Sequence, residues 1–473
     1  MTRLPAAWRF LLVLCVPGLV ACHRVAALPD PPVRLPGTFS AAGKVEAPDR
    51  WWTAFGDARL NELVGGVLDS NLDLLTAWDR LRQAEALARQ AAAGLWPWLD
   101  ATAAAGRTRS RTPTTGTTST SDFSLGLRAS YEVDLWSRVR ASRDAARLAA
   151  QASREDVATT AIALSAQTAI TWFRLLETVG QLEILDEQLR TNQDYLDLVT
   201  ARFERGQVSA VDVLQQQELV EASRSEKHLM EARARVLANQ LAVLLGRPPA
   251  EVAIPTDWRL PDLPPLPAAG LPADLVGRRP DVRAARLRLE SANRGVAAAI
   301  AERFPALTLT GLAETSAGHL EDLFENWVAS VAGSVLAPVL DGGRRAAEVE
   351  RTRAVVAQRF HEYAQAILRA LREVEDALVR ERHQQLHLTS VEKQLDFAAR
   401  AAAQSRERYV KGAEDYLRVL TTLRDLQRLQ RRLLEARREL LEDRVALYQA
   451  LAGGFPLTVP PAPGQGDDRD ARR

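Results

Sequence analysis

The sequence has little cysteine, little excess charge and no long apolar run, and each shortage excludes a class of protein. Only two of its 473 residues are cysteine, which excludes a disulfide-stapled scaffold. Its 61 basic and 60 acidic residues leave a net charge of +1, whereas a nucleic-acid binder shows a marked basic excess. Beyond the N-terminal segment, no stretch approaches the roughly 18 consecutive apolar residues of a transmembrane helix.

Motifs for catalysis and for cofactor binding are also lacking. The sequence contains no nucleophile elbow, phosphate loop, paired zinc-type cysteines or glycine-rich dinucleotide fingerprint. His383 and His387 lie one helical turn apart, but no third ligand is near them. Two polar residues on a solvated helix explain this pair better than a metal site does. The sequence therefore predicts no enzyme, no cofactor and no bound metal.

The first 22 residues have the pattern of a bacterial export signal that ends in a lipid attachment site. Two arginines precede an apolar run at 10–20, which is too short to span a bilayer, since spanning needs roughly 20 residues. The sequence LVAC at 19–22 resembles a lipobox, whose cysteine is acylated and becomes the new N-terminus. We expect a signal peptide at 1–21 and a lipid on Cys22. A chance cysteine beside an ordinary signal is the alternative.

Proline-rich stretches divide the remaining chain. The segment 22–50 is expected to be an extended strap, and 247–272 a linker with eight prolines between Pro248 and Pro272. The tail at 454–473 is rich in proline, glycine and aspartate and is expected to be disordered. The domain prediction that follows places a first repeat at 51–246 and a second at 273–453.

The two repeats are visible as matching motifs at a nearly constant spacing. The sequence RFERG at 202–206 returns as RYVKG at 408–412, an offset of 206 residues. The sequence LWPWL at 95–99 returns as RFPAL at 303–307, an offset of 208. Internal repetition of this kind predicts two copies of one structural unit. Each copy is expected to contain a helix, two strands, a long helix and a shorter helix.

The strand signal is clearest at 123–133, where six apolar residues alternate with polar or small ones. Its expected partner is 99–109, across a Ser/Thr-rich loop at 110–121. Strands of about 9 to 11 residues with one apolar face suit a transmembrane β-barrel. A soluble β-sandwich, whose strands alternate in the same way, is the alternative. The strands are expected within about 95–135 and, in the second copy, within about 304–340, at 307–315 and 327–337.

Helical patterns follow each strand pair. The segment 137–205 lacks proline and has Gly180 as its only glycine, and its apolar residues from Leu182 to Phe203 follow a 3/4 spacing. A helix of that length is a rod of roughly 100 Å, which has to lie beside other helices instead of surrounding a core. The expected helices are 137–205 and 209–246 in the first copy and 343–411 and 415–453 in the second.

Two short loops interrupt these helices in the same way. Gly206 fits the left-handed position after a helix, and Ser209 opens the next helix as its N-cap. In the second copy Gly412 and Asp415 occupy the same positions, 206 residues further on. Both loops are therefore expected to form tight tips of helical hairpins.

Four transmembrane strands cannot exist alone in a bilayer. An open sheet leaves two edges of unpaired N–H and C=O groups, each costing several kcal/mol in hydrocarbon. Bacterial barrels need about eight strands or more, so the chain has to form an oligomer. This reasoning permits a dimer with eight strands or a trimer with twelve and does not choose between them.

Four further motifs carry a resemblance to a known family. They are WWTAFGD at 51–57, YEVDLW at 131–136, RPDV at 279–282 and ALYQAL at 446–451. Together with the duplication, they resemble the outer membrane factor family, the TolC-like ducts of tripartite efflux pumps. The lipidated form is similar to the NodT subgroup of outer membrane lipoproteins. The resemblance covers about residues 40–455.

The resemblance implies a fold, a role and a set of partners. The fold would be mostly α with a transmembrane β portion: a homotrimer with a twelve-stranded β-barrel on a periplasmic α-barrel of twelve helices. Such a trimer would passively conduct substrates through the outer membrane of a Gram-negative bacterium, in contact with its lipid. Its partners would be a periplasmic adaptor (membrane fusion) protein and an inner-membrane transporter.

The resemblance also implies functional residues in the two loops. The family usually constricts its duct five residues after the second-loop glycine and places an acidic ring nine residues after it. Leu417 and Thr421 occupy these positions here, and threonine departs from the acidic pattern. We therefore expect a hydrophobic gate at Leu417, with Arg418 beside it and Asp415 as the nearest acidic group. The adaptor is expected to contact the tips at Gly206, Gln207, Ser209, Gly412 and Asp415.

A lipid-anchored periplasmic adaptor with a helical hairpin is the main alternative. An adaptor should contain one hairpin between split lipoyl-like and β-barrel domains, whereas this sequence predicts two full strand-and-hairpin copies. A soluble enzyme is a second alternative, which the lack of reactive motifs disfavours.

Overall fold

The computed structural model describes residues 33–46, 48–114, 116–249 and 251–451, and they form two compact units. The first unit contains Arg80–Ser153 and Ala284–Ala364; the second contains Val33–Asp79, Arg154–Arg283 and the chain from Gln365 onward. The predicted signal peptide, Cys22 and the tail at 454–473 lie outside the described residues. Of the helices in the described part, none is both long and apolar enough to cross a membrane.

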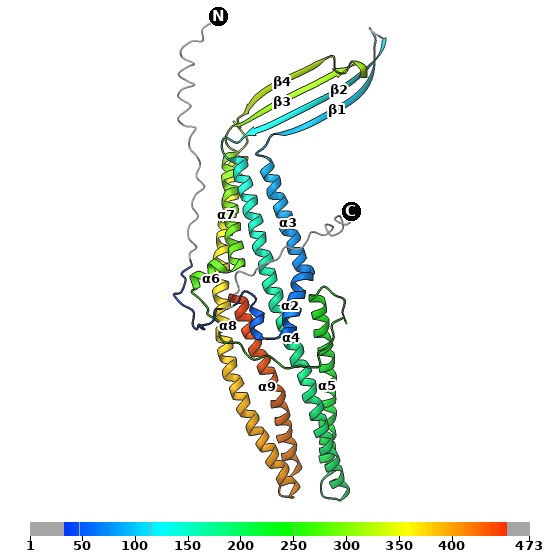
Figure 1. Cartoon of the computed structure of the whole chain (residues 1–473), viewed down its shortest axis with the longest axis vertical. Helices are drawn as coiled ribbons and strands as arrows, with labels where there is room; N and C mark the ends of the chain where they lie inside the picture. The colour runs from blue at the N-terminus through cyan, green and yellow to red at the C-terminus, as the bar shows by residue number, and fades with distance from the viewer. Residues whose placement is uncertain (1–32, 47, 115, 250, 452–473) are drawn as a thin grey trace, which may run out of the picture. The chain divides into compact units, whose positions relative to one another are not determined.

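The first unit carries a four-stranded antiparallel sheet whose strands follow in chain order (Figure 1). Odd-numbered residues share one face, which carries Leu99, Leu125 and Val331, and even-numbered residues share the other. These three side chains are 67%, 39% and 89% exposed, so the apolar face is uncovered in the single chain. The strands are β1 (Trp98–Thr112), β2 (Gly116–Val133), β3 (Ala306–Ala317) and β4 (Trp327–Leu336).

The Ser/Thr-rich loop predicted at 110–121 was wrong, because most of it is strand. Ser110 pairs with Thr118 and Thr112 with Gly116, so the two strands continue almost to the turn. The hydroxyl oxygens of Ser110 and Thr118 lie 3.1 Å apart. Threonine is a good strand former on an exposed surface, and polarity alone does not indicate a loop. Gly116, at φ 73°, supplies the left-handed residue that the turn requires.

Each copy continues as a long helix and a shorter one. The long helices α4 (Arg138–Glu204) and α8 (Arg344–Val410) contain 67 residues each, about 100 Å at 1.5 Å per residue. The shorter helices are α5 (Ala210–Leu244) and α9 (Tyr416–Leu451). Equivalent helices begin 206 residues apart, the offset that relates the loop motifs.

The first helix of each copy is broken in two, where one continuous helix was predicted. The breaks fall at Asn71 and Arg279, which are equivalent residues of the repeat. Asn71 accepts hydrogen bonds from the next helix and donates through Nδ2 to the Leu244 carbonyl at 2.8 Å. Arg279 precedes a proline, and a residue before proline avoids the α-helical region. The four helices are α2 (Ala58–Ser70), α3 (Leu72–Ala93), α6 (Pro272–Arg278) and α7 (Pro280–Ala301).

Motifs from distant parts of the sequence meet in the core of the second unit. Trp51, in the short helix η1 (Trp51–Phe55), stacks on Tyr448 with ring centroids 5.6 Å apart. Phe55 contacts both Tyr448 and Phe173. Arg279 donates to the Ala450 carbonyl at 3.2 Å. Three of the four motifs that carry the family resemblance thus serve one packing site.

The proline-rich linker contacts the helices of the second unit closely. The indole N–H of Trp258 donates to the Glu183 carboxylate on α4. A Cβ atom on Gly180 would come within 2.5 Å of the Trp258 ring and 2.8 Å of Leu434. This close approach explains the single glycine in α4.

The apolar seam predicted along α4 is only partly correct. Leu185 and Val199 are fully buried, but Phe203 is 45% exposed. Buried polar side chains, Gln188 and Asn192, occupy the seam between them.

Candidate functional site

The loop that joins α4 to α5 is a tight, capped turn. Gly206 has φ 68°, and the N–H groups of Gly206 and Gln207 donate to carbonyls of the last turn of α4 at 2.8 and 3.0 Å. Ser209 caps α5: its hydroxyl accepts from the Asp212 N–H at 3.4 Å. The Asp212 carboxylate in turn accepts from the Ser209 N–H at 2.9 Å. Gly206, Gln207 and Ser209 are all exposed.

The loop that joins α8 to α9 repeats this geometry. Gly412 has φ 74°, and the N–H groups of Gly412 and Ala413 donate to the last turn of α8 at 3.0 and 2.9 Å. The Asp415 carboxylate accepts from the Arg418 N–H at 2.9 Å. Gly412 and Asp415 are exposed. Both loops lie at the same end of the second unit (Figure 1).

A hydrophobic cluster and one arginine join the two hairpins near these loops. The Arg202 guanidinium lies 4.3 Å from the centre of the Tyr409 ring and donates to the carbonyls of Tyr409 and Val410 at 3.1 and 3.2 Å. A cation is favourable at these carbonyls because they end a helix. The cluster contains Val199, Leu219, Tyr409, Tyr416, Val419, Leu420 and Leu423.

Buried polar side chains extend this junction. The Tyr416 hydroxyl donates to the side-chain oxygen of Gln216, whose Nε2 donates to the Asn192 carbonyl at 2.6 Å. Gln427 donates to the Asn192 side-chain oxygen at 2.7 Å. Burial raises the pKa of the Tyr416 hydroxyl, so it stays protonated and remains a donor. The Tyr416–Gln216 and Gln427–Asn192 bonds cross between the two hairpins and fix their relative position, while the Gln216–Asn192 bond ties α5 to α4 within the first hairpin.

The residues of the predicted gate lie at the start of α9. Leu417 is 56% exposed and stands outside the buried cluster. With Val211 and Leu214 it lines a cavity of about 340 Å³ between α5 and α9. Thr421 lines the same cavity and donates its hydroxyl to the Leu417 carbonyl at 2.8 Å. Arg418 is exposed beside it.

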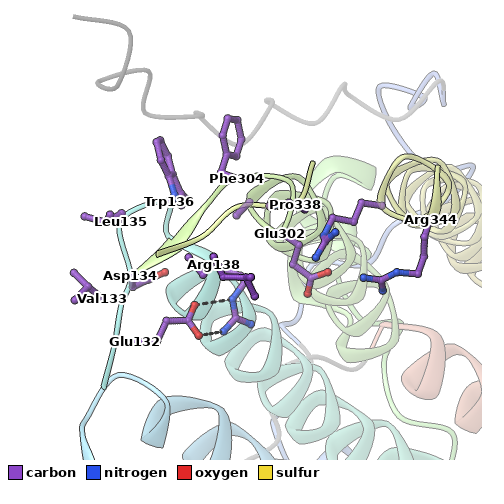
Figure 2. Close-up of a pocket in the computed structure, with 14 residues that line it drawn as sticks. Glu132, Val133, Asp134, Leu135, Trp136, Arg138, Glu302, Phe304, Pro338 and Arg344 are labelled. Carbon is purple, nitrogen blue, oxygen red and sulfur yellow. Dashed lines mark hydrogen bonds and ion pairs between the residues drawn. The ribbon is translucent and has the colours of Figure 1, made fainter. Parts of the chain in front are cut away.

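A second cavity, of about 410 Å³, lies in the first unit where the sheet meets α4 and α8 (Figure 2). Glu132 and Arg138 form a two-pronged ion pair at 2.9 and 2.6 Å. Trp136 stacks on Phe304 at 4.8 Å and donates its indole N–H to the Pro305 carbonyl at 2.7 Å. These side chains bind one another. We therefore interpret them as a structural connection that positions the strands, and not as a ligand site.

The sequence reasoning missed the residues that join the hairpins. Arg202 and Arg408 are equivalent in the repeat, yet Arg408 pairs with Glu414 of its own loop at 3.4 Å, whereas Arg202 crosses to the other hairpin. Repetition in the sequence marks both arginines but not this difference. The glutamines and Asn192 have no signal in an apolar pattern.

Comparisons with known proteins identify the class. The outer-membrane channel OprN has the same fold, with a TM-score of 0.81 and 28% sequence identity, over 91% of this chain and 99% of that one. This chain belongs to the outer membrane efflux protein family, whose model matches residues 63–247 and 271–453. The predicted family, its efflux role and its outer-membrane location are thereby confirmed.

Two relatives are similar over almost their full length. One is the pyoverdine export outer membrane protein OpmQ of Pseudomonas aeruginosa, 35% identical over 92% of this chain and 95% of the relative. Another is nodulation protein T of Rhizobium leguminosarum bv. viciae, 30% identical over 90% of this chain and 89% of the relative. The predicted similarity to the NodT subgroup is confirmed.

Proposed function

We propose that three copies of this chain form one passive exit duct, with a twelve-stranded barrel in the outer membrane and a twelve-helix barrel in the periplasm. The open four-stranded sheet supports the assembly of several copies, because its edges and its apolar face have no partner among the described residues. The number three is what the resemblance to the TolC-like ducts implies. Such a sheet is stable in hydrocarbon only when other copies close it. The duct has no catalytic step.

The mass of the detergent-extracted protein tests the number of copies. Native mass spectrometry should detect an assembly of three mature chains. An assembly of two chains, or a single chain, would contradict the proposal.

The two exposed loops are the proposed contact with a periplasmic adaptor. An inner-membrane transporter would deliver the substrate to the duct through this adaptor. Gln207 is exposed at the first loop tip, so a Gln207→Glu variant changes charge without disturbing the Gly206 turn. We expect the variant to form the oligomer and to lose export. Gln90→Glu, at an exposed position of α3, is the matched control and should keep export. Normal export by the Gln207→Glu variant would refute the docking role.

Leu417, on the first turn of α9, is the proposed gate. Copies of an exposed leucine around a duct axis would form an apolar constriction that excludes hydrated ions. Asp415 and Arg418 would flank this constriction, and Thr421 would stand one turn behind it, in place of an acidic ring.

A further inference from the structure

The outer edges of the sheet have a defined order. β1 pairs only with β2, and β4 pairs only with β3, within the part of the chain that the structure describes. Each edge strand therefore presents backbone donors and acceptors along one side. The middle pairing, β2 with β3, joins the second strand of one repeat to the first strand of the other.

The two hairpins of the sheet are copies of one another, residue for residue. In the first hairpin Trp98 pairs with Ser130. The sequence offsets, 208 for the first strand and 206 for the second, convert this pair into Ala306 and Leu336. These two residues are partners in the second hairpin. The same offsets therefore describe both the sequence repeat and the strand register.

A ring of identical chains contains one further kind of joint, from β4 of one chain to β1 of the next. This joint again links the second strand of one repeat to the first strand of another. We infer that it adopts the register of the β2–β3 joint, so that Val335 of one chain lies opposite Ala103 of the neighbouring copy. This inference rests on the proposed duct and names the interface that closes it.

The expected pair follows from an observed one. Ala129 of β2 pairs with Gly311 of β3, and the two offsets convert this pair into Val335 and Ala103. A Cβ atom on Gly311 would lie 3.8 Å from the Ala129 Cβ. Cysteines at such a pair are at the separation of a disulfide, whose Cβ atoms are about 3.8 Å apart.

The register fits both strands. All ten residues of β4 find partners inside β1, from Trp327 opposite Arg111 to Leu336 opposite Thr102. Odd-numbered residues of β4 lie opposite odd-numbered residues of β1, because the shift relating the joints is even; a slip of one residue would turn them to the other side. Val335 and Gly333 then face Ala103 and Ala105, and the last three odd-numbered positions of β1 in this joint, which face Val331, Ala329 and Trp327, are Arg107, Arg109 and Arg111. β4 carries no charged residue, so no like charges meet.

Cysteine pairs test the register. Val335→Cys is combined with a cysteine at Ala103, or at Ala101 or Ala105, which share its face but are displaced by two residues. Diagonal positions are about 7 to 8 Å apart and do not form a disulfide readily. After oxidation and heat denaturation without reductant, the Val335/Ala103 pair should give at least about fivefold more linked chains than either displaced pair.

The in-chain pair Ala129→Cys and Gly311→Cys is the positive control and should lose both free thiols. More linkage at Ala101 or Ala105 than at Ala103, in an intact oligomer, would overturn the register and leave the duct standing. No linkage at Ala103, while the in-chain pair oxidises, would also overturn it. A wild-type chain that is extracted as a monomer would refute the duct itself.

Discussion

Replacement of Arg444 by methionine tests how a buried ion pair holds the second unit together. Arg444 on α9 is 1% exposed and Glu381 on α8 is 6% exposed. The guanidinium binds both Glu381 oxygens, at 2.8 and 2.6 Å, and donates to the linker carbonyl of Pro265 at 2.8 Å. One side chain therefore connects two helices and the linker.

The loss of stability in Arg444→Met follows from the burial of this ion pair. Removing one partner of a buried pair leaves the other charge uncompensated, which costs about 3 to 5 kcal/mol. The entropy of unfolding is about 2.1 cal/mol/K per residue, or about 1 kcal/mol/K for the whole chain. If the chain unfolds as one, Arg444→Met should therefore lower the Tm by about 3 to 5 °C.

Calorimetry of the detergent-purified protein measures the shift. Arg437→Met is the matched control, because Arg437 pairs with Glu392 across the same two helices but is 54% exposed. It should lower the Tm by less than about 1 °C. The double variant Arg444→Met/Glu381→Leu removes both charges and should recover at least about half of the loss. A shift no larger than that of Arg437→Met, or a double variant that recovers nothing, would refute the reasoning.

Three further outcomes are expected. Burial raises the pKa of Asp443 to about 6; Arg380 opposes this shift, and the nearby carboxylates of Glu381, Glu442 and Glu439 add to it. The folded state therefore binds the Asp443 proton more tightly than the unfolded chain does. Stability from this group is therefore present below about pH 4 and is lost as the pH rises through 6. Asp443→Asn should raise the Tm at pH 7.5, where the gain in the free energy of unfolding has an upper limit of about 3 kcal/mol, and it should have little effect at pH 4. Equal effects at both pH values would contradict this. Gly206→Val should lower the free energy of unfolding by about 1 kcal/mol or more, because φ is 68° there. Gly37→Val should cost less, because Gly37 has equal space for a side chain and no positive φ. Cys22→Ala should abolish incorporation of labelled palmitate but keep the oligomer, since the proposed barrel would also hold it in the membrane; label that persists would place the lipid elsewhere.

Features set by local sequence could be predicted. The capping residues of the two loops place the helix ends, and the structure ends α4 at Glu204 and begins α5 at Ala210, within a residue of the predicted bounds. The duplication predicted a strand pair in each copy, and the registers of the two hairpins agree with its offsets. Such signals survive in one sequence because each depends on residues close together in the chain.

Features that depend on a distant partner could not be predicted. Asn192 is fully buried because Ser223 and Gln427, far away in the sequence, bind its amide. Arg202 crosses between hairpins only because the end of α8 lies within its reach. The break at Asn71 likewise requires the Leu244 carbonyl. A pattern of apolar residues contains none of these contacts.

Single-channel recording in planar bilayers tests the duct and its gate together. The purified wild-type oligomer should form channels of low conductance, and Leu417→Ala, which shortens the side chain proposed to close the duct, should raise that conductance. Leu386→Ala removes an equally exposed leucine from α8 and should leave the conductance unchanged. An unchanged conductance in an assembled Leu417→Ala oligomer would place the gate elsewhere, and the absence of channels from every assembled oligomer would contradict the duct.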